Sequence, residues 1–403
     1  MMKKKYWLFM MVLFGLLIGC NDDSDDAIIQ EQVNAFLQDF EQVGNTRASL
    51  INVLLRVTDF QELADADLNF NFDVIHYKVT YKTTYREEEI VASGLVSFPV
   101  TDQAMPILSF QNGTNTDNSQ APTEDLTTSI AISALASMGY IFVFPDYIGF
   151  GASADIVSPY HHAEYCARAV IDLLKATEEL AIQEGFGFNE DVFLAGYSEG
   201  GYATMATHQY FEMEQPEGFN LKASAPASGG YDVKAFQEYL FDQESYDNPF
   251  YLAFVALSYK EAYQYDDPLS DLFQEPYAMN IPDLFNGTQG GSSINAELTT
   301  EISELLQPEI LSDIDTDARY TDFVFALNDN SFINWQPINP MYMFHGTADM
   351  TVPYQNSLDT YEQLVSNGAQ TDRLQFIALE GANHTTGVVP YVIEALEIFE
   401  NLR

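Results

Sequence analysis

The chain has few basic residues. Of its 403 residues, 16 are Lys or Arg and 60 are Asp or Glu, so the formal net charge at pH 7 is −44. Nucleic acids are bound largely through phosphate contacts with clustered cations, and no basic cluster exists beyond the extreme N-terminus, which argues against a nucleic-acid partner. The same charge disfavours anionic lipid surfaces and polyanionic substrates, and it favours solubility.

Cysteine is scarce, with two residues in the chain. Cys20 ends a segment that opens with three lysines, continues as an apolar run too short for a comfortable membrane span, and closes on Leu17-Ile18-Gly19. This predicts a signal peptide over 1–19, and its end resembles a bacterial lipobox, in which the chain is cut before Cys20 and that cysteine is lipidated. Simple cleavage and an uncleaved anchor are the alternatives. We expect a lipoprotein of a bacterial cell envelope, on the outer membrane or surface, in which 20–45 form an acidic tether and the start of a helical region.

Metal-binding patterns are weak or missing. Cys166 remains alone once Cys20 is lipidated, and it is interpreted as a small core residue. The Asp-x-Asp-x-Asp stretch at 313–317 begins like a calcium loop, but Ala318 replaces the required Gly and no Glu follows at the twelfth position. We therefore expect neither a metal nor a cofactor.

The most informative stretch is Gly196-Tyr197-Ser198-Glu199-Gly200, which follows a short apolar run and precedes a helix-like segment. A serine between such glycines at a strand-to-helix turn is typical of a nucleophile elbow, where the hydroxyl is exposed above the sheet. The serine backbone is strained there, and larger side chains two residues away would collide with strand and helix. Ser198 is therefore predicted to be the nucleophile of a serine hydrolase.

A serine hydroxyl needs a neutral imidazole to take its proton, and a buried carboxylate must orient that imidazole. In this fold the order along the chain is Ser, acid, His. Asp349 and His384 each lie in a loop after a short apolar, strand-like run. The predicted triad is Ser198, His384 and Asp349. The rival acids, Asp372 and Glu380, flank the last strand.

The other five histidines are assigned lesser roles. His345 is expected to make a structural hydrogen bond in the acid loop, and His161 and His162 are placed at the rim of the pocket. His76 falls in a predicted strand and His208 on the helix after the elbow, so both are interpreted as structural.

The oxyanion that forms on attack needs N–H donors. In an elbow of this kind one donor is the N–H of the next residue, here Glu199, and the other comes from the loop after the third strand. That loop begins at Asn112-Gly113-Thr114. Gly113 or Thr114 is the predicted second donor, and an ordinary Asn-Gly turn is the alternative.

Short apolar runs alternate with amphipathic helices along the chain. Strands are predicted at 74–84, 89–98, 106–111, 140–145, 191–196 and 221–226, and helices at about 124–138, 162–184 and 199–213. The first two strands form an antiparallel pair, and the later alternation predicts a mostly parallel sheet covered by helices on both faces, an α/β-hydrolase fold.

The alternation of strands and helices stops at residues 232–340, a segment with helical periodicity and many aromatic residues. We predict a helical cap there, inserted between the sixth and seventh strands and dividing the core into 46–231 and 341–403. An apolar cap would exclude water from the elbow and bind an acyl chain or another apolar group, although most of its aromatics are expected to pack cap against core.

Several motifs together resemble the secretory lipase family of α/β-hydrolases and its bacterial lipase-like relatives. They lie at 92–99, 111–114, 145–151, 196–201 and 345–349. The family usually carries His-Gly after the third strand, where this chain has Asn112-Gly113. The resemblance implies hydrolysis of acyl esters, often triacylglycerols, under a helical cap. Small-molecule or lipid esters are the expected substrates.

Three alternatives remain open. A prolyl-oligopeptidase-type enzyme shares this core, but the stretch between Cys20 and the first predicted strand is too short for its usual propeller. A capped serine aminopeptidase is the second. The third is a non-catalytic binding lipoprotein on a hydrolase fold, against which the intact triad argues.

Overall fold

The computed structural model describes residues 34–403 except 58–60, 67 and 127–133. The predicted signal peptide and Cys20 lie outside the described residues, as does much of the helix predicted over 124–138. Residues Asn34–Arg403 form one compact unit.

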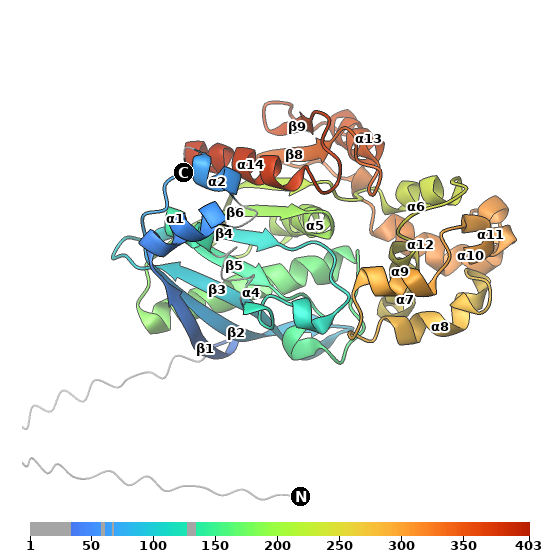
Figure 1. Cartoon of the computed structure of the whole chain (residues 1–403), viewed down its shortest axis with the longest axis horizontal. Helices are drawn as coiled ribbons and strands as arrows, with labels where there is room; N and C mark the ends of the chain where they lie inside the picture. The colour runs from blue at the N-terminus through green and yellow to red at the C-terminus, as the bar shows by residue number, and fades with distance from the viewer. Residues whose placement is uncertain (1–33, 58–60, 67, 127–133) are drawn as a thin grey trace, which may run out of the picture. The chain divides into compact units, whose positions relative to one another are not determined.

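One nine-stranded sheet runs through the described part of the chain, in the order β1-β2-β3-β5-β4-β6-β7-β8-β9 (Figure 1). The strands are β1 (Leu37–Thr46), β2 (Val74–Tyr85), β3 (Glu88–Pro99), β4 (Met105–Gln111), β5 (Ile141–Pro145), β6 (Phe188–Tyr197), β7 (Asn220–Ala227), β8 (Met341–Gly346) and β9 (Leu374–Leu379). The pairs β1·β2, β2·β3 and β3·β5 are antiparallel, and the remaining pairs are parallel. The carboxyl ends of the parallel strands therefore meet at one edge, where loops from several strands can build a site.

Helices cover both faces of this sheet. The core helices are α1 (Ala48–Val57), α2 (Gln61–Asp65), α4 (Ala163–Glu184), α5 (Glu199–Glu214), α13 (Tyr354–Ser366) and α14 (Val388–Leu402). In β5, Ile141 and Val143 pack in the same apolar layer as α4 and α5. Phe142 and Phe144 pack in the opposite layer with α1 and α14. A strand that is apolar at every position is thus buried on both sides, because its side chains alternate between the two faces. The predicted α/β-hydrolase fold is confirmed.

The N-terminal edge of the sheet corrects one prediction. Residues 20–45 were expected to be a tether leading into a helical region, yet Leu37–Thr46 form β1, paired antiparallel with β2. Most of its side chains are exposed or only partly buried, so no apolar alternation marks it in the sequence. This strand lies at the edge of the sheet and is held by backbone pairing with β2. The Glu179 carboxylate also accepts a hydrogen bond from the Leu37 N–H at 2.6 Å. Among the described residues, α1 is the first helix.

The chain between β7 and β8 forms the expected helical cap, drawn in yellow to orange in Figure 1. Its helices are α6 (Val233–Phe241), α7 (Phe250–Tyr263), α8 (Tyr277–Leu284), α9 (Gly291–Glu297), α10 (Ile302–Leu305), α11 (Pro308–Asp313) and α12 (Thr321–Asp329). In α7 the Tyr259 hydroxyl donates to the His161 carbonyl at 2.8 Å, and the Ser258 hydroxyl donates to the Ser158 carbonyl at 2.6 Å. These contacts fasten α7 to the core. Because core and cap belong to one compact unit, the boundaries 232 and 340 stay a prediction.

Candidate active site

Ser198 lies at the turn between β6 and α5, with φ 62° and ψ −122°. This is an unfavourable backbone conformation for a residue with a side chain, and such strain is typical of functional sites. The flanking glycines make the turn possible. A Cβ on Gly196 would lie 2.3 Å from the Gly200 carbonyl oxygen, and one on Gly200 would lie 1.9 Å from the Gln111 carbonyl oxygen. The sequence thus folds into the sharp elbow that its glycine spacing predicts.

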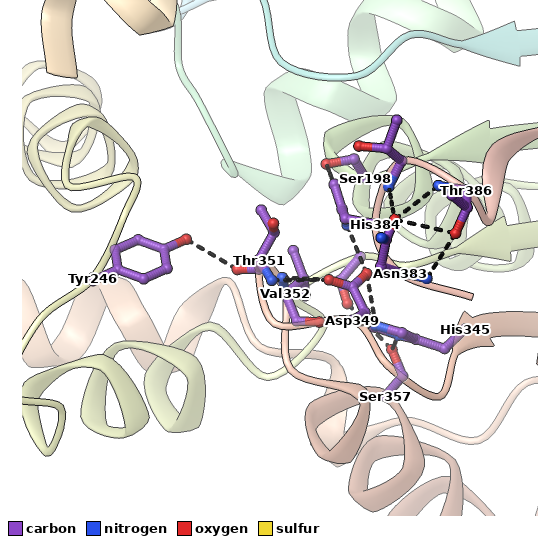
Figure 2. Close-up of polar contacts among 12 residues, drawn as sticks. Ser198, Tyr246, His345, Asp349, Thr351, Val352, Ser357, Asn383, His384 and Thr386 are labelled. Atoms are coloured by element: carbon purple, nitrogen blue, oxygen red, sulfur yellow. Dashed lines mark hydrogen bonds and ion pairs between the residues drawn. The ribbon is translucent and has the colours of Figure 1, made fainter. Parts of the chain in front are cut away.

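The structure brings Ser198, His384 and Asp349 together (Figure 2). His384 Nε2 lies 2.9 Å from Ser198 Oγ, and His384 Nδ1 lies 2.6 Å from Asp349 Oδ2. Asp349 follows β8 and His384 follows β9, so the two loops meet the elbow at the carboxyl edge of the parallel strands. A neutral His384 in this arrangement donates from Nδ1 to the carboxylate and accepts the serine proton at Nε2.

Asp349 is 2 % exposed, and its carboxylate is held on both oxygens. Oδ1 accepts the backbone N–H groups of Thr351 at 2.9 Å and Val352 at 3.1 Å. Burial alone would raise the pKa of Asp349, but hydrogen bonds from His345 and His384 outweigh it and lower the pKa to about 2. The carboxylate is therefore ionised throughout the neutral range.

A second histidine contacts the same carboxylate oxygen. His345 Nε2 lies 3.3 Å from Asp349 Oδ2 and 2.9 Å from the Val352 carbonyl oxygen (Figure 2). A carbonyl oxygen can only accept, so Nε2 carries a proton and donates. Nδ1 lies 2.6 Å from the Ser357 hydroxyl on α13. The structural hydrogen bond expected for His345 is present, and it reaches the triad acid as well.

The His384 loop is held by its neighbour. Asn383 Oδ1 accepts the N–H groups of Thr385 at 3.0 Å and Thr386 at 2.9 Å. The Tyr197 ring lies beside the imidazole, with ring centroids 5.4 Å apart. The His384 side chain keeps 18 % exposure, which leaves it accessible to a substrate while its orientation is fixed.

The predicted oxyanion donors surround the elbow. A Cβ on Gly113 would lie 3.7 Å from Ser198 Cβ, so the loop after β4 passes directly beside the serine. Within the described residues, the N–H groups of Gly113 and Thr114 donate to no protein acceptor. Glu199 begins α5, and the first N–H of a helix has no partner inside that helix. All three groups are therefore available to a negatively charged oxygen.

A cavity of about 490 Å³ opens over Ser198 and His384. Its lining is Asn112, Gly113, Thr114, Asn115, Gln120, Pro122, Asp125, Phe144, Ser198, Tyr251 and His384. Among these described residues, amide and hydroxyl side chains outnumber apolar ones, and α7 of the cap contributes Tyr251. The cavity under the cap is thus lined by both polar and apolar groups, and the expectation that it binds an apolar group stays a prediction. Most buried apolar side chains of the cap pack in one cluster with those of the core.

The rival residues lie elsewhere. Asp372 and Glu380 are exposed and make no hydrogen bond with His384. His161 and His162, expected at the pocket rim, are instead buried against tyrosine rings, and burial lowers the pKa of His161 to about 3. His76 bonds the Thr46 and Ser97 hydroxyls, and His208 bonds the Ser224 hydroxyl and Glu212.

Sequence reasoning missed three side chains of the site. These are the Glu199 carboxyl, Tyr246 and Tyr251, which come together with the core only through the tertiary fold. Glu199 is 3 % exposed, and burial raises its pKa to about 8. Its place next to the nucleophile was the one signal in the sequence that could have drawn attention to its side chain.

Within the described residues, no group of three or more His, Cys, Asp or Glu side chains is arranged to hold a metal ion. Two aspartates of the 313–317 stretch form ion pairs instead: Asp315 pairs with Lys234, and Asp317 pairs with Arg319. None of the described helices is both long enough and apolar enough to cross a membrane.

Comparison with known proteins places the chain among hydrolases. Its fold is similar to a predicted hydrolase from Legionella pneumophila (TM-score 0.81, 24% identity, 91% of this chain and 98% of that one). It is also similar to the ligand-bound rice cell wall degrading esterase LipA from Xanthomonas oryzae (TM-score 0.79, 23% identity, 92% and 100%). The closed state of lipase A from Candida antarctica is more distant (TM-score 0.66, 15% identity, 92% and 82%). None of the curated proteins matches the sequence significantly.

The α/β-hydrolase superfamily expected from the motifs is confirmed. The sequence profile of the X-Pro dipeptidyl-peptidase (S15) family matches residues 93–386, well over half of the chain, from the middle of β3 to the histidine loop. The chain is therefore a hydrolase of the α/β-hydrolase fold and belongs to the X-Pro dipeptidyl-peptidase (S15) family.

Proposed function

We propose that this protein is a serine hydrolase that cleaves carboxylic esters through an acyl-enzyme. The observation that carries the proposal is the continuous hydrogen-bond chain from Ser198 Oγ through both nitrogens of His384 to Asp349. Such a chain activates a serine for attack on an acyl carbon and has little use in a protein that only binds.

In the proposed mechanism Ser198 Oγ attacks the ester carbonyl carbon, and His384 Nε2 takes the hydroxyl proton. The carbonyl oxygen becomes an oxyanion, and the N–H groups of Glu199 and of Gly113 or Thr114 stabilise it. His384 then protonates the leaving alkoxide, and the acyl group stays on Ser198. Water, deprotonated by His384, attacks the acyl-enzyme and releases the acid. Asp349 stays ionised throughout, orients the imidazole and stabilises its protonated form.

The choice of ester rests on two of the similar structures, and the choice of acyl group rests on the cavity lining. Two of the similar structures are described as an esterase and a lipase, and the similarity extends over 92% of this chain. The cavity is lined by amides, hydroxyls and a few rings rather than by aliphatic side chains. A long acyl chain needs an extended apolar wall, so we propose short-chain or polar esters as the preferred substrates.

An X-Pro dipeptidyl-peptidase is the second candidate, because that is the family whose profile matches. The same triad cleaves amides and esters, so the chemistry alone does not separate the two. Such a peptidase must recognise the free N-terminal ammonium of its substrate near the scissile bond. The carboxylate of Asp125 lies in the cavity lining, and a negative charge there would attract this ammonium.

The deciding experiment compares two substrate panels. The native protein and Ser198→Ala are assayed on p-nitrophenyl esters from acetyl to palmitoyl and on Xaa-Pro p-nitroanilides. Turnover of short esters that is abolished by Ser198→Ala supports the proposal. Turnover of the Xaa-Pro anilides with little on any ester would replace it with the peptidase. No turnover in either panel, together with no labelling by a fluorophosphonate, would favour a binding protein.

We also propose that Cys20 carries a lipid anchor that holds the protein to a bacterial envelope membrane. The support is the sequence alone, in which the cysteine closes a signal-like segment. Metabolic labelling with an alkyne-tagged fatty acid tests this anchor. Native protein should incorporate the label and Cys20→Ala should not, whereas equal incorporation in both would reject it.

A further inference from the structure

Two histidines contact one oxygen of the Asp349 carboxylate, and the triad uses only one of them (Figure 2). His384 Nδ1 lies 2.6 Å from Asp349 Oδ2, and His345 Nε2 lies 3.3 Å from the same atom. His345 lies near the end of β8 and is fully buried. Burying an imidazole costs free energy unless its nitrogens find partners, so the partners of His345 indicate what it does.

Both ring nitrogens of His345 are fixed by what surrounds them. Nε2 lies 2.9 Å from the Val352 carbonyl oxygen, which can only accept, so Nε2 carries a proton. The same N–H lies beside Asp349 Oδ2 and attracts its negative charge. Nδ1 lies 2.6 Å from the Ser357 hydroxyl, which donates to it when the ring is neutral. Ser357 therefore favours the tautomer that presents a proton to the acid loop.

The contacts of His345 also close the turn that carries the acid. The Val352 N–H donates to Asp349 Oδ1 at 3.1 Å, and the carbonyl of the same residue accepts from His345. His345 belongs to β8, and Ser357 belongs to α13 on the other side of the turn. A side chain in a loop is held precisely only when regular elements support it. His345 supplies that support to Asp349 from a strand, and Ser357 extends it to a helix.

We propose that His345 is a positioning residue for the triad acid: its Nε2–H holds Asp349 Oδ2 and the Val352 carbonyl in place, so that the carboxylate meets His384 Nδ1 in the productive orientation. This inference rests on the proposed function and deepens it, because it adds a second histidine to the site. His345 acts through Asp349 and not on the substrate.

The first test is ester kinetics on the full chain. His345→Leu fills much of the volume of the imidazole but has no donor. Its kcat should fall by about 10- to 100-fold with little change in KM, because a displaced carboxylate disturbs the reacting groups and leaves the substrate cavity intact. The loss should be smaller than the ~10³–10⁴-fold loss expected for Asp349→Asn.

His345→Gln is the rescue variant. The side-chain N–H of glutamine reaches about as far from the backbone as Nε2 of histidine does, so it can donate to the same oxygens. This variant should recover most of the kcat that His345→Leu loses. A donor that restores activity distinguishes a hydrogen bond to the acid loop from a need for bulk in the core.

A double variant tests whether His345 acts through Asp349. Once Asp349→Asn has removed the carboxylate, His345 has no acid left to position. Adding His345→Leu should then lower kcat by less than about threefold further, whereas independent effects would multiply.

His76→Leu is the matched control. His76 is also a fully buried histidine, and its ring nitrogens bond the Thr46 and Ser97 hydroxyls at 3.0 Å and 2.8 Å, outside the site. Both leucine variants should lower the free energy of unfolding, but kcat of folded His76→Leu should stay within about threefold of native. Equal losses of kcat in the two folded variants would mean that a lost buried contact, and not the place of His345 beside Asp349, explains the effect.

A measurement on the native protein does not depend on whether any variant folds. The ¹⁵N chemical shifts of an imidazole distinguish a protonated ring nitrogen from an unprotonated one. In native protein labelled with ¹⁵N-histidine, Nε2 of His345 should carry a proton. An unprotonated Nε2 would overturn the inference, because the ring would then have nothing to donate to Asp349.

Three kinetic results in an active enzyme would also overturn the inference alone. These are a His345→Leu variant with kcat within about threefold of native, a His345→Gln variant no better than His345→Leu, and losses that multiply in the double variant. A native protein that turns over no ester or amide and resists fluorophosphonate would instead overturn the proposed function, and the inference with it.

Discussion

The hydroxyl of Tyr246 donates a hydrogen bond of 2.9 Å to the backbone carbonyl of Thr351 (Figure 2). Tyr246 belongs to the cap and is buried, whereas Thr351 belongs to the loop of the triad acid. The Thr351 N–H in turn donates to Asp349 Oδ1 at 2.9 Å. The cap is therefore connected to the Asp349 carboxylate, the proposed triad acid, through one residue of backbone.

Tyr246→Phe should loosen this connection. Loss of one hydrogen bond lowers the free energy of unfolding by about 1 kcal/mol, and a less ordered acid loop should lower kcat several-fold with little change in KM. Urea unfolding and ester kinetics measure the two effects. The matched control is Tyr320→Phe, because the Tyr320 hydroxyl is buried in the cap and has no partner among the described residues. Equal losses in both variants would contradict the connection.

Asp349→Asn should lower kcat by about 10³–10⁴-fold, because an amide cannot hold the imidazole in its productive tautomer or stabilise its protonated form. Asp372→Asn and Glu380→Gln should leave kcat within about threefold, since both side chains are exposed and neither contacts His384. Stopped assays on one p-nitrophenyl ester compare all three. A large loss of kcat in Asp372→Asn or Glu380→Gln would assign the role of the triad acid to that residue and not to Asp349.

The pKa of Asp349 also predicts how stability depends on pH. Its pKa is lowered from 3.8 to about 2 in the folded protein, so the ionised carboxylate stabilises the fold above pH 3.8, and this contribution is lost as the pH falls toward 2. At 1.36 kcal/mol per pKa unit the contribution is about 2 kcal/mol. The difference in unfolding free energy between native and Asp349→Asn should shrink by about this amount between pH 5 and pH 2. If the difference in unfolding free energy between the two proteins does not change with pH, Asp349 is not an ionised carboxylate that accepts hydrogen bonds on both oxygens.

Gly200→Ala should be among the most damaging single-methyl additions in the chain. The new Cβ would meet the Gln111 carbonyl oxygen at 1.9 Å, so the helix start and the oxyanion loop cannot keep their contact. We expect a loss of several kcal/mol in stability, or no folded protein. Gly290→Ala is the control, because a Cβ there meets nothing within 4 Å, and it should stay within about 0.5 kcal/mol of native. Thermal unfolding of both variants decides the comparison.

The triad geometry could be predicted from the sequence because each of its parts has a local signal. The glycines around Ser198 encode the elbow, and the apolar runs before Asp349 and His384 encode strands whose loops must meet at one sheet edge. Chain order then selected these residues over Asp372 and Glu380. Local pattern and topology agree at this site, so both lead to the same assignment.

Other features had no local signal. β1 is an edge strand whose formation depends on backbone pairing with β2, and its side chains do not alternate in polarity. The mixed lining of the cavity, to which Tyr251 contributes, and the contact of Tyr246 with Thr351 depend on how a distant cap meets the core. Such contacts follow from tertiary packing, which periodicity along the chain does not encode.

The most direct test of the account is fluorophosphonate labelling of the native protein, with the site of the adduct mapped by peptide mass spectrometry. The account predicts one adduct, on the peptide that contains Ser198. The adduct should be absent in Ser198→Ala and should form far more slowly in His384→Gln. A folded native protein that takes up no label, or takes it up on another residue, would contradict the claim that Ser198 is an activated nucleophile.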